Sequence, residues 1–310
     1  MENVTFAFSP IEITAAGGTI GLVAGVADEC IIRDLTVSGS VTLNATGDVT
    51  FGVFGSLSGG QATYRHYVDL ENDIYEELPF VDGVTISLTY DLTGADLTVG
   101  GLAGESNILI VNADGTVNMT LVGNDILCGG VIGSLTGALS GCDILGSVSA
   151  EGVRADIGGL VGVTTGDIAS SSANVTIEAS VSGTAYAGGA VGSGNCTISD
   201  LTVTGDVSVH TDATQGIAAL LELETEYPIL AAAGGAVGYL YGGGLENATV
   251  TLVEAAASAD YEGSLYVLAG GAAGYLRERV NVTVLAGGSV SATGGNAVFD
   301  ESVAVYDEKE

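Results

Sequence analysis

The residues best suited to chemistry gather in one acidic stretch. Asp69, Glu71 and Asp73 occupy alternate positions, as do the first carboxylate ligands of a calcium-binding loop. The match then fails, because Ile74 stands where such a loop needs glycine and Phe80 where it needs a closing glutamate. We therefore expect a solvated acidic loop, with a calcium site as the weaker alternative and no other cofactor.

Catalytic arrangements are weakly represented. Tyrosines and carboxylates between residues 61 and 80 allow a carbohydrate site with paired acids, but the strand-like segments elsewhere carry mainly Thr, Ser and Val. His66 and His210 are the only histidines, and neither belongs to a nucleophile motif, although a Ser-His-Asp arrangement is conceivable around either. We predict a protein that is not an enzyme, with a polysaccharide lyase or glycoside hydrolase as an alternative.

Four cysteines suggest cross-linking chemistry in an oxidising compartment. Zinc is not expected, because no Cys-x-x-Cys pair occurs. Cys30 and Cys196 take similar places in repeats that lie about 24 Å apart, too far for a bridge within one chain, so they are candidates for intersubunit disulfides. Cys128 and Cys142 flank one repeat and are candidates for an intrachain disulfide. Buried free thiols are the alternative for all four.

Asn-x-Ser/Thr sequons make seven asparagines candidates for glycosylation in an exported protein. They are Asn3, Asn44, Asn118, Asn174, Asn195, Asn247 and Asn281.

A glycine motif that occurs eight times indicates how the chain positions these groups. Its clearest copy is Gly158-Gly159-Leu160-Val161-Gly162, and the last glycines of the copies fall at 25, 55, 104, 133, 162, 192, 238 and 274. A spacing near 29–30 residues with three longer intervals is typical of a repeat architecture. Each repeat holds short apolar or alternating segments and no long helical pattern.

We predict an all-β fold, a right-handed parallel β-solenoid of about eight repeats with loop or helix insertions. It forms one domain over residues 1–310, with insertions at 61–80 and 212–230. The apolar motif positions are expected to point inward: Leu102, Val131, Leu160, Val161 and Val191.

Charge and hydropathy limit the partners. Six basic residues against 38 acidic ones give a net charge of −32, which makes nucleic acid and anionic surfaces poor partners. No apolar run reaches about 18 residues, so no membrane-spanning helix is expected, and no signal peptide is visible. Charged residues are only 14% of the chain, so we expect neighbouring molecules to cover much of the surface, or a large apolar interior.

The motif resembles the GLUG-type repeat of bacterial and archaeal surface proteins. The Gly-Gly-Leu-Val-Gly core, Gly166-Asp167-Ile168 and Val203-Thr204-Gly205-Asp206-Val207 carry this resemblance over residues 17–292. It implies a parallel β-solenoid at the cell surface, and family members include adhesins and extensions of surface proteases. The glycine-rich, acidic and lysine-poor composition is also similar to that of a methanogen-type sheath or surface-layer subunit.

The two ends of the chain suggest a function. The segments near Val4–Ile13 and Val298–Tyr306 read as strands without a polar cap, and exposed strand edges favour strand addition. We therefore predict a non-enzymatic, extracellular structural protein that assembles with itself into a cell-surface layer or sheath. Cell-wall glycans are expected as further partners. The alternative is an adhesin or stalk module of a larger surface protein that binds its ligand at the tyrosine-rich insertion.

Overall fold

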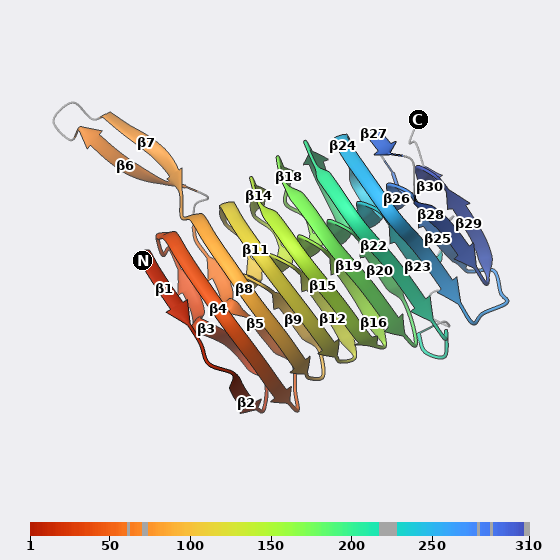
Figure 1. Cartoon of the computed structure of the whole chain (residues 1–310), viewed down its shortest axis with the longest axis horizontal. Coiled ribbons are helices and arrows are strands. Elements are labelled where there is room, and N and C mark those ends of the chain that lie inside the picture. The colour runs from red at the N-terminus through yellow and green to blue at the C-terminus, as the bar shows by residue number, and fades with distance from the viewer. Residues whose placement is uncertain (61–62, 70–73, 217–227, 278–279, 286–287, 307–310) are drawn as a thin grey trace.

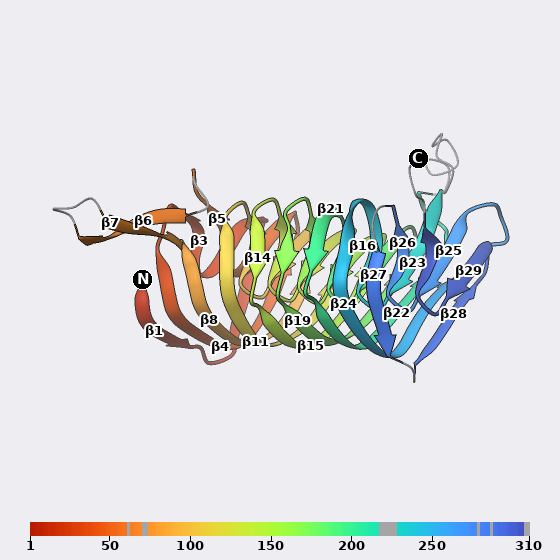
Figure 2. The same ribbon diagram turned by 90° about the horizontal axis from the view of Figure 1, so that it is seen from above.

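The fold consists of strands throughout the part of the chain that the structure describes. The computed structural model describes residues 1–310 except 61–62, 70–73, 217–227, 278–279, 286–287 and 307–310. Within those bounds no helix is present. Strands cross an elongated body side by side from the N-terminal to the C-terminal end (Figure 1). Seen from above, strands on the near and far sides of the body cross at an angle (Figure 2).

The strands form three ladders of parallel pairs. The first ladder is the broadest and holds β1 (Glu2–Ala7), β2 (Ile11–Ala15), β4 (Ile32–Ala45), β8 (Val81–Thr93), β11 (Leu109–Val122), β15 (Asp143–Gly152), β19 (Ser172–Val181), β22 (Thr202–Thr211), β24 (Val237–Ala259), β27 (Val280–Leu285) and β28 (Ser289–Thr293). Their side chains alternate between buried and exposed along most of these strands, because successive residues point to opposite faces.

The second and third ladders contain shorter strands on either side of the glycine motif. The second holds β3 (Gly18–Asp28), β5 (Val49–Ser58), β9 (Leu97–Gly100), β12 (Asp125–Gly129), β16 (Arg154–Gly158), β20 (Ala185–Gly188), β23 (Ile229–Gly234), β25 (Tyr266–Gly270) and β29 (Asn296–Asp300). The third holds the later parts of β3 and β5, β10 (Ala103–Ser106), β13 (Ile132–Leu135), β17 (Val161–Thr164), β21 (Val191–Ser199), the start of β24, β26 (Ala273–Leu276) and β30 (Val303–Tyr306). Two short strands, β14 (Ala138–Ser140) and β18 (Ile168–Ala169), connect β11 to β21.

The sequence period is also the pairing period. Cys128 of β12 pairs with Val99 on one side and Ile157 on the other, so partners are 29 residues apart. We call one such period a unit. The register continues across the first insertion, where Phe51 pairs with Val99. Within the described part of the large sheet, each strand therefore pairs with strands of the preceding or following unit.

The predicted right-handed solenoid of about eight repeats with loop or helix insertions is wrong, although the all-β class is correct. Eight strands form a closed parallel barrel, in the order β11, β14, β18, β21, β24, β22, β19 and β15 and back to β11. The other paired strands of the large sheet lie outside this ring. The ring closes because long strands such as β11 and β24 pair at their two ends with different neighbours, which a periodicity in the sequence does not reveal.

The apolar motif positions line the interior, as expected. Leu102, Val131, Leu160, Val161 and Val191 are all fully buried. They belong to one continuous apolar core that extends through the described units.

The first insertion is an antiparallel hairpin. β6 (Thr63–Asp69) pairs with β7 (Ile74–Pro79), and Tyr67 lies opposite Tyr75. The Arg65 guanidinium stacks over the Tyr75 ring at 4.4 Å. The hairpin projects from the body near its N-terminal end (Figures 1 and 2). In the second insertion, residues 217–227 lie outside the described residues, so the expected helix is not tested.

The second glycine of the motif allows a close backbone approach. A Cβ on Gly159 would lie 2.1 Å from the Gly189 carbonyl oxygen and 2.6 Å from the Val175 side chain of the first ladder. Since a backbone atom of the next unit is the nearest neighbour, a rotamer change does not relieve the clash. At this glycine the chain therefore bends inward against the opposite ladder.

We predict that Gly159→Ala lowers the free energy of unfolding by about 3 kcal/mol, because the added methyl group overpacks the interior. Chemical denaturation of purified protein measures this loss. Gly60→Ala is the matched control, since its Cβ would meet only the far end of the Glu29 side chain, at 3.1 Å. Equal stability of the two variants would show that the backbones are not this close.

Candidate functional site: an outer groove

The inward bend at the motif leaves a groove on the outer surface between the second and third ladders. Two rows of outward-pointing side chains line it. The second ladder supplies Thr50, Thr98, Leu127, Asp156, Tyr186, Ala232 and Leu268, and the third supplies Ser56, Glu105, Ser134, Val163, Ser193, Tyr239 and Tyr275.

The groove is narrow because the last motif glycine lies against the opposite ladder. A Cβ on Gly104 would lie 2.6 Å from the Thr50 side chain and 2.7 Å from the Thr98 carbonyl oxygen. Glycine at this position therefore leaves the bottom of the groove without a side chain, between the two rows. The character of the groove then depends on the residues that flank the motif.

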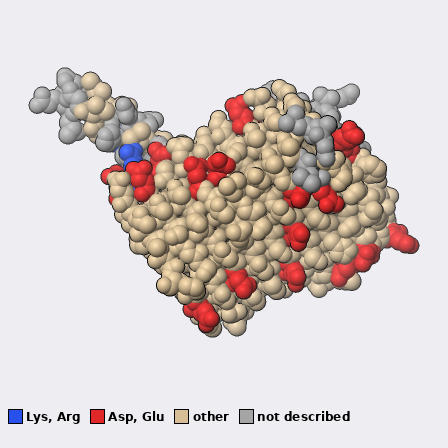
Figure 3. All heavy atoms as spheres, in the orientation of Figure 1, with Lys and Arg blue, Asp and Glu red and all other residues tan. Residues whose placement is uncertain are grey.

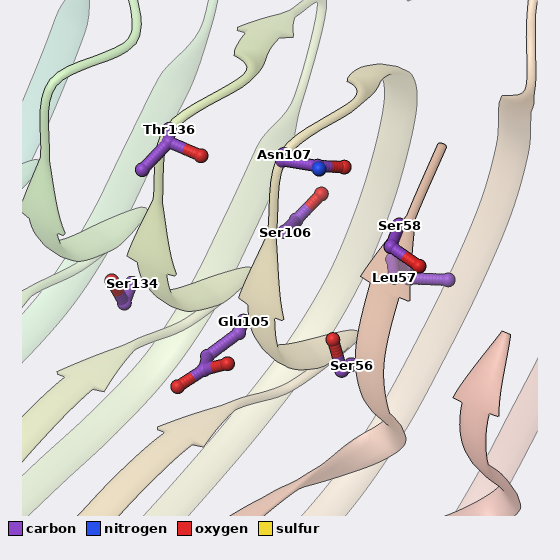
Figure 4. Close-up of a pocket in the computed structure, with 8 residues that line it drawn as sticks. All are labelled: Ser56, Leu57, Ser58, Glu105, Ser106, Asn107, Ser134 and Thr136. Carbon is purple, nitrogen blue, oxygen red and sulfur yellow. The ribbon is translucent and has the colours of Figure 1, made fainter. Parts of the chain in front are cut away.

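The section toward the N-terminal end is open and polar. A cavity of about 180 Å³ lies along the third-ladder row and takes no residue from the second-ladder row. It is lined by Ser56, Leu57, Ser58, Glu105, Ser106, Asn107, Ser134 and Thr136 (Figure 4). Glu105 pairs in register with Ser56 and Ser134, so each of three consecutive units places one polar side chain in the row. None of these lining residues is basic. The section offers hydrogen bonds and one carboxylate to a ligand.

The middle section holds an ion pair between a buried aspartate and a half-exposed arginine. Asp156 is fully buried, and its Oδ2 accepts a hydrogen bond from Nη2 of Arg154 at 3.2 Å. Its Oδ1 has no hydrogen-bond partner in the structure. Burial raises the pKa of the Asp156 carboxyl, and this effect outweighs the lowering caused by Arg154 and the Ser193 hydroxyl. The site therefore contains a carboxylate with an unused acceptor.

Tyrosines fill the section toward the C-terminal end. The ring centroids of Tyr186 and Tyr239 are 5.0 Å apart, and those of Tyr239 and Tyr275 are 4.9 Å apart, within the usual range for aromatic pairs. The Tyr186 hydroxyl donates to the Ile229 carbonyl at 3.0 Å, and burial raises its pKa. This packed cluster closes the groove at one end.

The buried Asp156 gives a pH prediction. Its folded pKa is raised, so between the ordinary value of 3.8 and the folded pKa the native state binds more protons than the unfolded state. Its contribution to stability is then greatest in acid and is lost as the pH rises through the folded pKa. We predict that wild type loses more stability than Asp156→Asn between pH 4 and pH 7. Denaturation series for both proteins measure this, and parallel pH profiles would contradict the assigned burial.

His210 does not form a catalytic triad. Its Nδ1 lies 3.0 Å from the Ser258 hydroxyl, and its Nε2 lies 4.0 Å from Oδ2 of Asp260, which exceeds hydrogen-bond distance. The side chains of His210 and Asp260 are 44% and 76% exposed, and Ser258 also donates to the Val209 carbonyl. A cavity of about 260 Å³ adjoins His210, but the geometry provides no activated nucleophile.

The predicted calcium site lies mostly outside the described residues, so the structure does not test it. Asp69 ends β6, whereas Glu71 and Asp73 lie outside the described part of the chain. Among described residues no group of three His, Cys, Asp or Glu side chains could hold a metal ion. His66 also lies on β6, whereas His210 lies on β22.

All four cysteines are free thiols in this structure. Cys196 is buried, and burial raises its pKa to about 12, which corrects its assignment as an intersubunit disulfide candidate because a second chain cannot reach it. The intrachain candidates, Cys128 and Cys142, do not bridge, and the Cys128 thiol instead contacts the Met119 sulfur at 3.3 Å. Only Cys30 is exposed.

The sequon asparagines are all exposed, as glycosylation would require. This holds for Asn3, Asn44, Asn118, Asn174, Asn195, Asn247 and Asn281. Their use stays a prediction.

No family model, curated protein or solved structure matches this chain. The resemblance to glycine-repeat surface proteins therefore stays a prediction. No helix in the described segments has the length and apolar character to cross a membrane.

Sequence reasoning missed the groove, although a signal was present. Its two rows are the residues two positions before the first motif glycine and one position after the last. In the clearest copy these are Asp156 and Val163, and in the copy at 100–104 they are Thr98 and Glu105. The residues at these two flanking positions are mostly polar in the N-terminal copies of the motif and include tyrosines in the C-terminal copies.

Proposed function

We propose that this chain is a non-enzymatic structural protein of the cell exterior whose copies join end to end into a fibre, sheath or layer. One observation carries the proposal. A column of inward-pointing residues extends through the body and ends on an exposed phenylalanine. Its members are Ile20, Phe51, Val99, Cys128, Ile157, Ala187, Ala233, Ala269 and Phe299.

Burial along the column changes only at its ends. Phe51 and Ala269 are fully buried, as are the members between them, whereas Phe299 is 62% exposed. Ile20 at the other end is partly buried against the core. In a head-to-tail pair, Phe299 of one copy would cover Ile20 of the next and continue the column.

The N-terminal end offers a wider apolar surface. Phe6 and Phe8 are only partly buried, whereas Val37, which pairs with Phe6 in the next unit, is fully buried. A mostly apolar cavity of about 360 Å³ lies at this end, and Val23 and Phe54 are among the residues lining it. The Phe6 side chain therefore occupies a position that is buried in the following unit, but no unit of the described chain covers it.

The parallel direction of the strands favours a head-to-tail contact between two copies of the chain. Every pair in the large sheet is parallel, so the first and last units expose complementary edges of the same three ladders. A head-to-tail contact preserves strand direction, and a heterologous contact of this kind extends without closing. The net charge of −32 opposes it. On the face shown in Figure 3, acidic side chains are scattered and basic ones form one small patch, so salt should strengthen association.

We predict that Phe299→Asp abolishes end-to-end assembly and leaves the monomer folded, because the side chain is exposed in the monomer and would be buried in the contact. Sedimentation velocity across protein and salt concentration measures the assembly, and circular dichroism checks the fold. Phe299→Leu is the matched control and should still assemble. A wild type that stays monomeric at high concentration in every salt condition would contradict the proposal.

A further inference from the structure

We propose that the open section of the groove binds a neutral, hydroxyl-rich chain, and specifically a segment of uncharged glycan. This site lies on the flank of the body and does not depend on the end-to-end contact. Its polar groups come from β5, β10 and β13 and from Asn107 and Thr136, which follow β10 and β13 (Figure 4). Consecutive parallel strands are about 4.8 Å apart, so donors and acceptors recur at short intervals along the groove.

The charge of the lining selects the chemistry of the ligand. Glu105 is exposed at the centre of the section and no lining residue is basic. A carboxylate accepts hydrogen bonds from hydroxyl groups and repels anions. The hydroxyls of Ser56 and Ser134 donate and accept. This set suits a neutral polyol and disfavours an acidic polysaccharide or a phosphorylated ligand.

The next unit places a buried carboxylate in the second-ladder row, outside the lining of the cavity. Asp156 belongs to the groove row, is fully buried, and keeps Oδ1 without a hydrogen-bond partner. Buried polar atoms in native proteins are nearly always paired, and an exception calls for an explanation. The Oδ1 atom has no exposed surface, so a bound chain would not reach it, and the cavity alone carries the proposal.

Size and backbone pairing exclude the main competitors. The cavity of about 180 Å³ is smaller than the roughly 300 Å³ at which pockets for drug-sized molecules begin, so it fits one unit of a longer chain. An extended peptide would add to a free strand edge, but β10 is paired on both sides, with β5 and β13. A ligand in this cavity can therefore be recognised only by side chains, because no unpaired strand edge is available there.

The test titrates the full-length protein at low concentration with neutral oligosaccharides of β-linked glucose, N-acetylglucosamine and mannose, four to six units long. An oligogalacturonate of equal length is the anionic arm. Isothermal calorimetry measures affinity, and tyrosine fluorescence reports on the neighbouring cluster. We expect saturable binding of at least one neutral oligosaccharide and none of the anionic one. No saturable binding of any neutral oligosaccharide, or a preference for the anion, would overturn the proposal.

Two variants test the location of the site. Glu105→Gln should weaken the neutral ligand about tenfold, because it replaces a charge-assisted hydrogen bond with a neutral one. Ser134→Phe should block the groove, and Val163 at the next position of the same row shows that an apolar side chain is accommodated there. Glu178→Gln on the exposed face of β19 is the matched control and should bind as wild type does. Equal affinities in Glu105→Gln and Glu178→Gln would place the ligand elsewhere.

Discussion

The structure depends on the close approach of backbones at the glycine motif. Parallel pairing places each motif against its copies in the preceding and following units, so any side chain at Gly159 would meet the carbonyl of Gly189. The same constraint recurs at Gly130, whose Cβ would lie 2.2 Å from the Gly159 carbonyl. Because the units are linked through backbone atoms, the register is fixed from one unit to the next, and the hairpin of the first insertion projects from the body.

The two proposed surfaces follow from that register. Inward-pointing side chains at equivalent positions of successive units stack into apolar columns. The last side chain of such a column has no further unit over it, and Phe299 is accordingly exposed. Outward positions beside the motif accumulate into the groove, where the inward bend brings Tyr186 and Tyr239 into contact. The ends therefore expose apolar groups and parallel strand edges, whereas the flank exposes hydroxyls and a carboxylate.

Periodicity in the sequence predicted what is local and repeated: strands, parallel partners 29–30 residues away, and a buried Leu160. It did not predict the closed ring. The ring forms because β11 and β24 each pair with one strand at their start and with a different strand at their end. Whether Cys196 is buried or available for cross-linking stayed open, because motif spacing gives a position along the chain but not the face of the strand. The groove was also missed, because its rows join residues such as Asp156 and Ser193, which lie on different strands and come together only where the chain bends.

Electron cryo-microscopy of the protein at high concentration and salt tests the central claim most directly. Nine units in the Ile20–Phe299 column, spaced at about 4.8 Å, give an axial subunit repeat of about 43 Å. The account predicts unbranched filaments with that repeat, in which the parallel ladders continue across each subunit junction. Particles that remain single, or assemblies in which the bodies lie side by side with their end units uncovered, would contradict it.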